Sequence, residues 1–86
     1  MAEIVKLVGT ELTLNGTANL VASATVVKVI NSNTTNVTLL TVVPSTGANT
    51  TTSLLPSSMI YLQKPMDAKI TSSLTTGVLA TPIAFT

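Results

Sequence analysis

Few side chains in this 86-residue chain could carry acid-base chemistry. The carboxylates are Glu3, Glu11 and Asp67, and there is no His, Cys or Arg. General acid-base catalysis needs a titratable pair held in a cleft. Glu3 and Glu11 could meet across neighbouring strands, but solvated charges that protect a sheet edge from pairing are the simpler interpretation. Asp67 lies beside Pro65 and is typical of a turn.

A Ser or Thr nucleophile needs a nearby base. Without His, the only candidates are the four lysines, Lys6, Lys28, Lys64 and Lys69, and no Ser-X-X-Lys motif occurs. Thr25 and Lys28 have the matching spacing, but residues three apart on a strand point to opposite faces. We therefore expect no catalytic residues and no enzyme.

The same residue types argue against cofactors, metals and nucleic acids. The four glycines are scattered one per turn, so no phosphate-binding loop is formed. Zinc lacks Cys and His ligands, and Asp67 with neutral hydroxyls would make at best a weak calcium site. Four lysines and two aromatic residues make neither a basic face nor a stacking platform. We expect no cofactor, no metal and no nucleic-acid partner.

Short runs rich in Val, Ile, Leu and Thr alternate with Gly, Pro, Asn and Ser turns. Such residues suit a pleated, half-buried surface, and no long helical pattern competes with them. The chain is predicted to be all-β, a single domain over residues 1–86. The expected architecture is a small antiparallel β-sandwich or barrel, jelly-roll-like, of seven to eight short strands. The expected strands are 2–8, 11–14, 18–20, 23–30, 36–43, 50–55, 59–64 and 77–86, and 68–71 is a candidate for a short edge strand.

Turn chemistry predicts how some of these strands pair. Asn15-Gly16 is a strong hairpin signal, so 18–20 should pair with 11–14. A second hairpin is expected where 36–43 returns along 23–30. Pro82 cannot donate to a ladder and places the last strand at an edge or a bulge.

The predicted core takes the apolar residues of one face of each strand. In the strand 36–43 both faces are partly apolar, which suggests that both are covered. The expected core residues are Ile4, Leu12, Val27, Val29, Leu39, Ile60, Leu62, Leu79 and Phe85.

The composition also indicates how the surface is used. Hydrophobic residues make up 45% of the chain and charged residues 8%, with a net charge of +1. An ordinary chain carries roughly 25% charged residues, so here Thr, Ser and Asn must supply the polar surface. In a symmetric assembly each surface charge risks facing a like charge, and neutral hydroxyl groups avoid that cost. A neutral surface therefore favours a subunit of an assembly, although a stable Thr-rich monomer remains the alternative.

No targeting signal or membrane-spanning segment is expected in this sequence. Met1-Ala2-Glu3-Ile4-Val5-Lys6 has an acidic residue where a signal peptide needs basic ones, and no long apolar run follows. The longest apolar stretches are far below the roughly 20 residues of a membrane-spanning helix. Secretion and membrane insertion are both unsupported.

Two segments carry a resemblance to a known class of protein. They are Ile60-Tyr61-Leu62-Gln63-Lys64-Pro65-Met66-Asp67 and Val78-Leu79-Ala80-Thr81-Pro82-Ile83-Ala84-Phe85. With the length and the Thr, Ala, Val and Asn bias, they resemble small virion structural proteins of tailed bacteriophages, especially marine ones. The resemblance implies a β-sandwich or barrel subunit that decorates a capsid or forms part of a neck, tail or fibre.

The leading hypothesis is a capsid decoration or cement protein that stabilises the phage head by bridging capsomers. Its partners would be itself, as a homo-oligomer such as a trimer, and the major capsid or another virion protein. It would be found in the virion, assembled in the host cytoplasm. Chain ends extend most easily onto a partner. The predicted contact residues are Ala2, Glu3, Ile4, Val5, Lys6, Thr81, Pro82, Ile83, Ala84, Phe85 and Thr86, although these segments could equally be two ordinary edge strands.

Two other functions fit the sequence. A neck, tail or fibre component would differ in copy number per particle. A glycan-binding or ice-binding module would use threonine clusters, at 34–35, 50–52 and 75–76. These clusters lack a constant period, and Tyr61 is the single candidate for a sugar platform.

Overall fold

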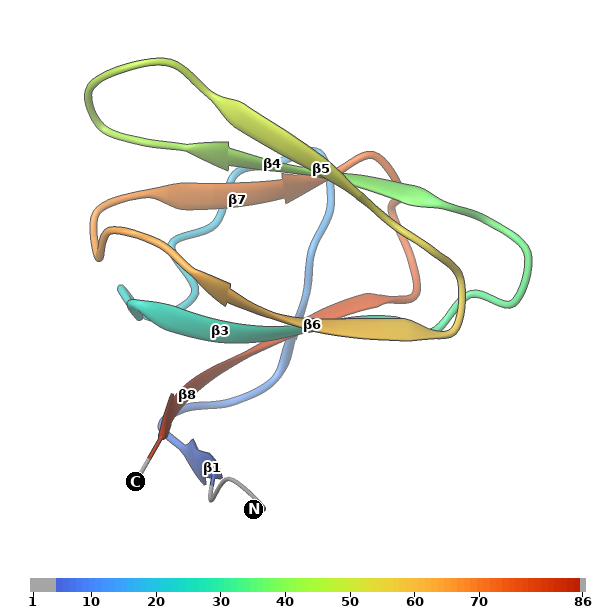
Figure 1. The fold of residues 1–86 in the computed structure, drawn as a ribbon, viewed down its shortest axis with the longest axis horizontal. Helices are drawn as coiled ribbons and strands as arrows, with labels where there is room; N and C mark the ends of the chain where they lie inside the picture. Colours follow the sequence, from blue (N-terminus) through green and yellow to red (C-terminus); the bar gives the residue numbers. More distant parts are fainter. Residues whose placement is uncertain (1–4, 86) are drawn as a thin grey trace.

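The computed structural model describes residues 5–85, which form eight β-strands and no helix (Figure 1). None of the described segments could therefore cross a membrane as a helix. The strands are β1 (Val5–Leu7), β2 (Leu12–Thr13), β3 (Val26–Asn31), β4 (Thr38–Val43), β5 (Thr50–Leu54), β6 (Ser58–Gln63), β7 (Lys69–Ser72) and β8 (Val78–Phe85). The all-β prediction is confirmed.

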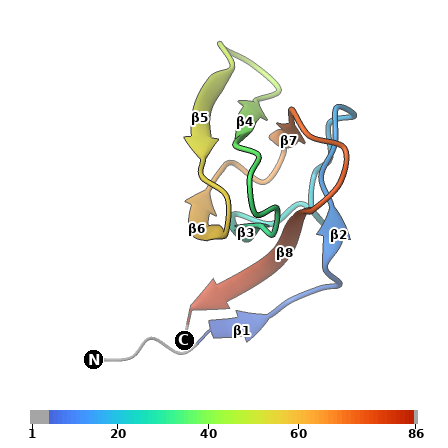
Figure 2. The ribbon, with the colours of Figure 1, turned by 90° about the vertical axis from the view of Figure 1, so that its right-hand side faces the viewer.

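The strands form two antiparallel sheets stacked as a sandwich that is not closed into a barrel (Figures 1 and 2). One sheet has the order β1-β8-β3-β6, with β2 also paired to β8. The other has the order β5-β4-β7. Seen end on, β5 lies over β6 on one side, and β7 and β2 lie on the other (Figure 2).

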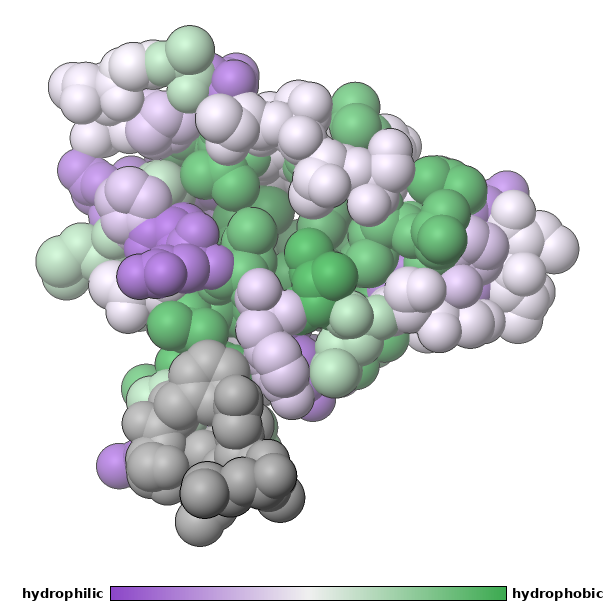
Figure 3. Space-filling model, in the orientation of Figure 1, coloured by the Kyte–Doolittle hydropathy of each residue, from purple (hydrophilic) through white to green (hydrophobic). Residues whose placement is uncertain are grey.

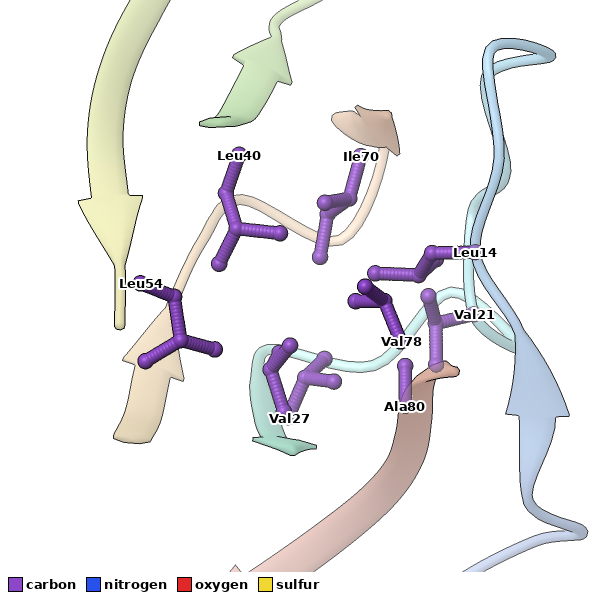
Figure 4. Close-up of a cluster of buried hydrophobic side chains, with 9 residues drawn as sticks. Leu14, Val21, Val27, Leu40, Leu54, Ile70, Val78 and Ala80 are labelled. Carbon is purple, nitrogen blue, oxygen red and sulfur yellow. The ribbon is translucent and has the colours of Figure 1, made fainter. Parts of the chain in front are cut away.

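The core lies between the two sheets and is built from small and medium aliphatic side chains (Figure 4). Alternation along β3 turns Val27 and Val29 inward, as predicted, and both are completely buried. Leu12, Ile60 and Leu62 are partly buried and pack against this cluster. The cluster consists of Leu14, Val21, Val27, Val29, Leu40, Leu54, Ile70, Val78 and Ala80.

The inward face of β4 differs from the prediction. Leu40 is buried and Leu39 is 44% exposed, because Thr38, Leu40 and Val42 face the core. Because both faces of this strand carry apolar residues, the alternation of residue types did not indicate which face is buried. Leu79 is half-buried on the outer face of β8. Of the other predicted core residues, Ile4 lies outside the described residues, and the surroundings of the Phe85 side chain are likewise not described.

The predicted hairpin at Asn15-Gly16 is wrong. Asn15 accepts a hydrogen bond from the Thr17 N–H through its side chain, at 2.8 Å, and closes a local turn instead. The chain then crosses to the other sheet, where Asn19 bridges Ile70 of β7. This crossing closes one side of the sandwich, and it allows Val21 to fill the core.

The predicted pairing of 23–30 with 36–43 is also wrong. β3 pairs with β6 and β8, whereas β4 belongs to the other sheet. The Asn31 side chain explains why the chain crosses from one sheet to the other between β3 and β4. This buried side chain donates to the carbonyls of Asn36 and Leu54, at 2.9 and 3.1 Å, and accepts from the backbone and side-chain amides of Asn33. These four bonds bind the loop and the end of β5 to the first sheet.

Pro82 lies in a strand that is paired on both sides, so the edge prediction is wrong. Its carbonyl accepts a hydrogen bond from the Val8 N–H at 3.0 Å. In an antiparallel strand the nitrogen and the carbonyl of one residue point to the same side, so the Pro82 nitrogen, which carries no hydrogen, also points toward β1 and β2. That side changes partner here, from β2 to β1. The proline therefore occupies the gap between two partner strands, where no donor is needed.

Candidate assembly site

The side of the sandwich opposite the crossing is open. β5 and β6 are the terminal strands of their sheets there, and they overhang a groove of about 150 Å³. An apolar band runs along this face between the two strands (Figure 3). The groove is lined by Leu40, Val42, Thr50, Thr51, Thr52 and Leu62.

The threonines of β5 show that this groove belongs to the interior face of the sandwich. Thr50 and Thr52 pair with Val42 and Leu40 and share their inward face. Both threonines are nevertheless exposed. The interior surface of β5 thus continues beyond the part that the other sheet covers.

Backbone groups of β6 also face this side. The Lys64 N–H donates to the Thr25 carbonyl at 2.8 Å, so Lys64 bonds across to the β3 side. Backbone direction alternates along an antiparallel strand. Gln63 and Met59 therefore turn their N–H and C=O groups away from β3, towards the open side.

The same reasoning applies to β5. The Ser73 N–H donates to the Leu39 carbonyl at 3.0 Å, which places Leu39 toward β7 and Leu40 toward β5. Thr52 is opposite Leu40 and bonds to it, so Thr51 and Ser53 direct their backbone groups outward. Two ladder edges thus border one groove.

Neither edge carries the usual protection against pairing. Soluble proteins place charges, prolines or bulges on exposed edge strands. β5 reads Thr-Thr-Thr-Ser-Leu and β6 reads Ser-Met-Ile-Tyr-Leu-Gln, without Lys, Arg, Asp, Glu or Pro. Both edges are chemically suited to accept a further strand.

A second feature is a ribbon that projects from the sandwich (Figures 1 and 2). β1 pairs with the end of β8, Val5 with Phe85, Lys6 with Ala84 and Leu7 with Ile83. Beyond Pro82, β8 no longer pairs with β3. Leu7 is 65% exposed and Val8 is 58% exposed, so the ribbon presents apolar side chains to solvent.

Five of the seven predicted contact residues that the structure describes belong to this ribbon: Val5, Lys6, Ile83, Ala84 and Phe85. Thr81, Pro82 and Ile83 are buried within the chain, so their side chains offer little surface. Ala2, Glu3, Ile4 and Thr86 lie outside the described residues. The β5–β6 groove was not among the predicted sites, and the absence of charge in both strands was the signal that could have indicated it.

The chain shows no significant match to any protein family, curated protein or solved structure.

The ionisable residues form no larger cluster in the described part of the chain. Glu11 accepts a bond from the Thr81 hydroxyl at 3.4 Å, and Asp67 accepts one from the Ser45 hydroxyl at 2.6 Å. Burial lowers the pKa of Lys64, and the nearby Asp67 partly offsets this effect. Within residues 5–85, no three His, Cys, Asp or Glu side chains gather where they could hold a metal.

The threonines form one row that the sequence did not reveal. Thr41 of β4 is opposite Thr51 on one side and Thr71 on the other, on the outer face of the three-stranded sheet. On the same face of this sheet, the residues two positions before and after Thr41 in β4 are Leu39 and Val43, and Val43 is opposite Lys69 of β7. The row is thus a single line three residues long.

Proposed function

We propose that this chain is a non-enzymatic structural subunit that functions in contact with other proteins. The observation that carries the proposal is the open side of the sandwich, where two uncharged edge strands border an apolar groove. Exposed edges of this kind pair readily with another strand.

Exposed apolar side chains support the same function. Large hydrophobic residues are exposed on the ribbon, on the outer faces of β4 and β6, and in loops. The net charge of +1 supplies little repulsion between copies. A small domain also gains stability from subunit contacts, because it buries only about 60% of its unfolded surface.

The more specific proposal is a capsid decoration or cement protein of a tailed bacteriophage. It rests on the resemblance of segments 60–67 and 78–85 to small virion proteins and on the suitability of a compact sandwich for repeated attachment. Each contact would be small, and repetition over the shell would strengthen it. The major capsid protein and other copies of this chain are the proposed partners, and the virion is the proposed location.

Binding to purified phage heads tests this function. Contacts made by apolar area and backbone pairing should hold equally well at low and high salt, because charge screening has little to act on. Retention of the protein on the heads in both conditions is expected. Strong loss of occupancy at high salt, or no binding at all, would contradict the proposal.

Copy number distinguishes the closest alternative, a neck, tail or fibre component. Decoration requires many copies per head, whereas a neck ring requires few. Quantitative mass spectrometry of purified virions measures this number directly.

The row of Thr41, Thr51 and Thr71 is the observation that favours a glycan-binding or ice-binding module as second candidate. Glycan-array binding or thermal hysteresis by the purified chain would promote that candidate. Absence of both activities would retire it.

A further inference from the structure

We propose that the β5–β6 groove of one copy receives the projecting β1–β8 ribbon of a second copy. The inference deepens the proposed function and rests on it, because it names the partner and the contact surfaces of the assembly. Two features of this one chain carry it: a groove without a cover and a projecting ribbon with exposed apolar side chains.

The groove requires an extended occupant. Its walls are the inner faces of Leu40, Val42 and Leu62, and its rim is formed by two strand edges. Outward backbone groups at Met59 and Gln63 on one edge, and at Thr51 on the other, are spaced to pair with a β-strand. A strand or ribbon with apolar side chains satisfies both demands, whereas a helix leaves its own backbone saturated.

The ribbon has little support from its own chain beyond its base, where Ile83 is buried. β1 has extensive contacts with β8 alone among the described strands. An isolated two-stranded ribbon is marginally stable in water. Packing the exposed Leu7 and Val8 against another surface would supply the missing stabilisation.

The ribbon also has an edge to offer. The Val8 N–H donates to the Pro82 carbonyl, so the backbone of Lys6 faces β8 and that of Leu7 faces outward. β1 has no second strand neighbour among the described residues. Its outward groups can therefore continue the ladder of β6 in a neighbouring copy.

Charge favours a second copy over a basic or acidic partner. The groove lining contains no ionisable side chain, so it offers nothing to a charged ligand. On the described ribbon, Lys6 is the single charged residue of β1, and the end of β8 has none. A neutral groove and a nearly neutral ribbon can meet without burying unpaired charge.

Two matched pairs of variants test the contact by sedimentation velocity. Thr52→Lys places an ammonium group in the groove, whereas Thr75→Lys places it in the exposed loop between β7 and β8, away from the groove and its two edges. Leu7→Lys charges the ribbon, and Met66→Lys charges a loop residue of similar exposure. All four sites are exposed, so the monomer should keep its fold, and circular dichroism checks this.

Thr52→Lys and Leu7→Lys should each weaken self-association at least about tenfold, because assembly would bury a new charge. Thr75→Lys and Met66→Lys should change it less than about threefold. Equal effects of a test variant and its control would overturn the proposal.

Mixing separates this contact from pairing between identical edges. Thr52→Lys retains an intact ribbon and Leu7→Lys retains an intact groove, so an equimolar mixture should form a heterodimer that neither forms alone. No rescue on mixing would overturn the proposal. A wild-type protein that binds phage heads but stays monomeric would also overturn it while leaving the proposed function standing, whereas a protein that self-associates through these sites but ignores heads would refute decoration alone.

Discussion

Replacing Asn31 with alanine should be among the most destabilising single changes in this chain. The side chain is fully buried, and its amide makes four hydrogen bonds. The bond to the Leu54 carbonyl is buried where water cannot replace the lost amide, so its loss costs about 1–3 kcal/mol even though this carbonyl also faces Thr38 in the ladder. The other three bonds are partly buried and are worth about 0.5–1.5 kcal/mol each, because water can replace the lost partner.

These contributions sum to about 2.5–7.5 kcal/mol in the free energy of unfolding, and bonds made by one side chain are not additive, so we expect a loss of about 3–5 kcal/mol. A domain of this size has a total of roughly 4–13 kcal/mol, at about 0.05–0.15 kcal/mol per residue. Asn31→Ala should therefore remove a large part of the stability. Asn36→Ala is the matched control, because Asn36 is exposed and takes part in this network through its backbone carbonyl.

Urea unfolding followed by far-ultraviolet circular dichroism measures both variants, since the chain has no Trp for fluorescence. Asn36→Ala should stay within about 0.5 kcal/mol of wild type. A loss below about 1 kcal/mol for Asn31→Ala, or equal losses for the two variants, would refute the role of Asn31 as the link between the sheets.

Three further changes have expected effects on urea unfolding. Gly77→Ala should destabilise by about 1–3 kcal/mol, because Gly77 has a φ of +83° and an added Cβ would lie 2.6 Å from Asn33 Nδ2; an unchanged midpoint would contradict this. Ala22→Gly should be neutral or stabilise by up to about 1 kcal/mol, since Ala22 has a φ of +56° and the relief of left-handed strain outweighs the added chain entropy; clear destabilisation would count against it. Lys64 has a lowered pKa, so the folded state binds fewer protons than the unfolded state between that pKa and 10.5, and stability should rise with pH in this window. Lys64→Met should lack that rise, and an identical pH profile for the variant and wild type would exclude Lys64 as its source.

The positions of the strands were predictable because local residue types determine them. Runs of Val, Ile, Leu and Thr between turn residues marked the longer strands, and alternation in β3 identified Val27 and Val29 as core. Where both faces were apolar, as in β4, alternation could not choose between Leu39 and Leu40. That choice depends on which sheet covers the strand.

Strand pairing was not predictable from the same signals. Asn15-Gly16 fits a two-residue hairpin, yet the chain crosses between sheets there because burial of Leu14 and Val21 outweighs the local turn preference. The loop after β3 crosses because the Asn31 side chain is buried, and a polar side chain in a polar run gives no sign of that burial.

The candidate site was predictable only in part. Chain ends were expected to make contacts, and the described part of them forms a projecting ribbon. The groove brings together β4, β5 and β6, which contribute residues separated along the chain. Its position depends on the stacking of two sheets, and no local pattern encodes that stacking.

Sedimentation velocity of the wild-type chain over a wide concentration range tests the central claim most directly. Open edges, an apolar groove and a projecting ribbon predict that the average mass rises with concentration to at least twice the 8.8 kDa of one chain, with little dependence on salt. A constant mass of 8.8 kDa up to millimolar concentration would contradict the account.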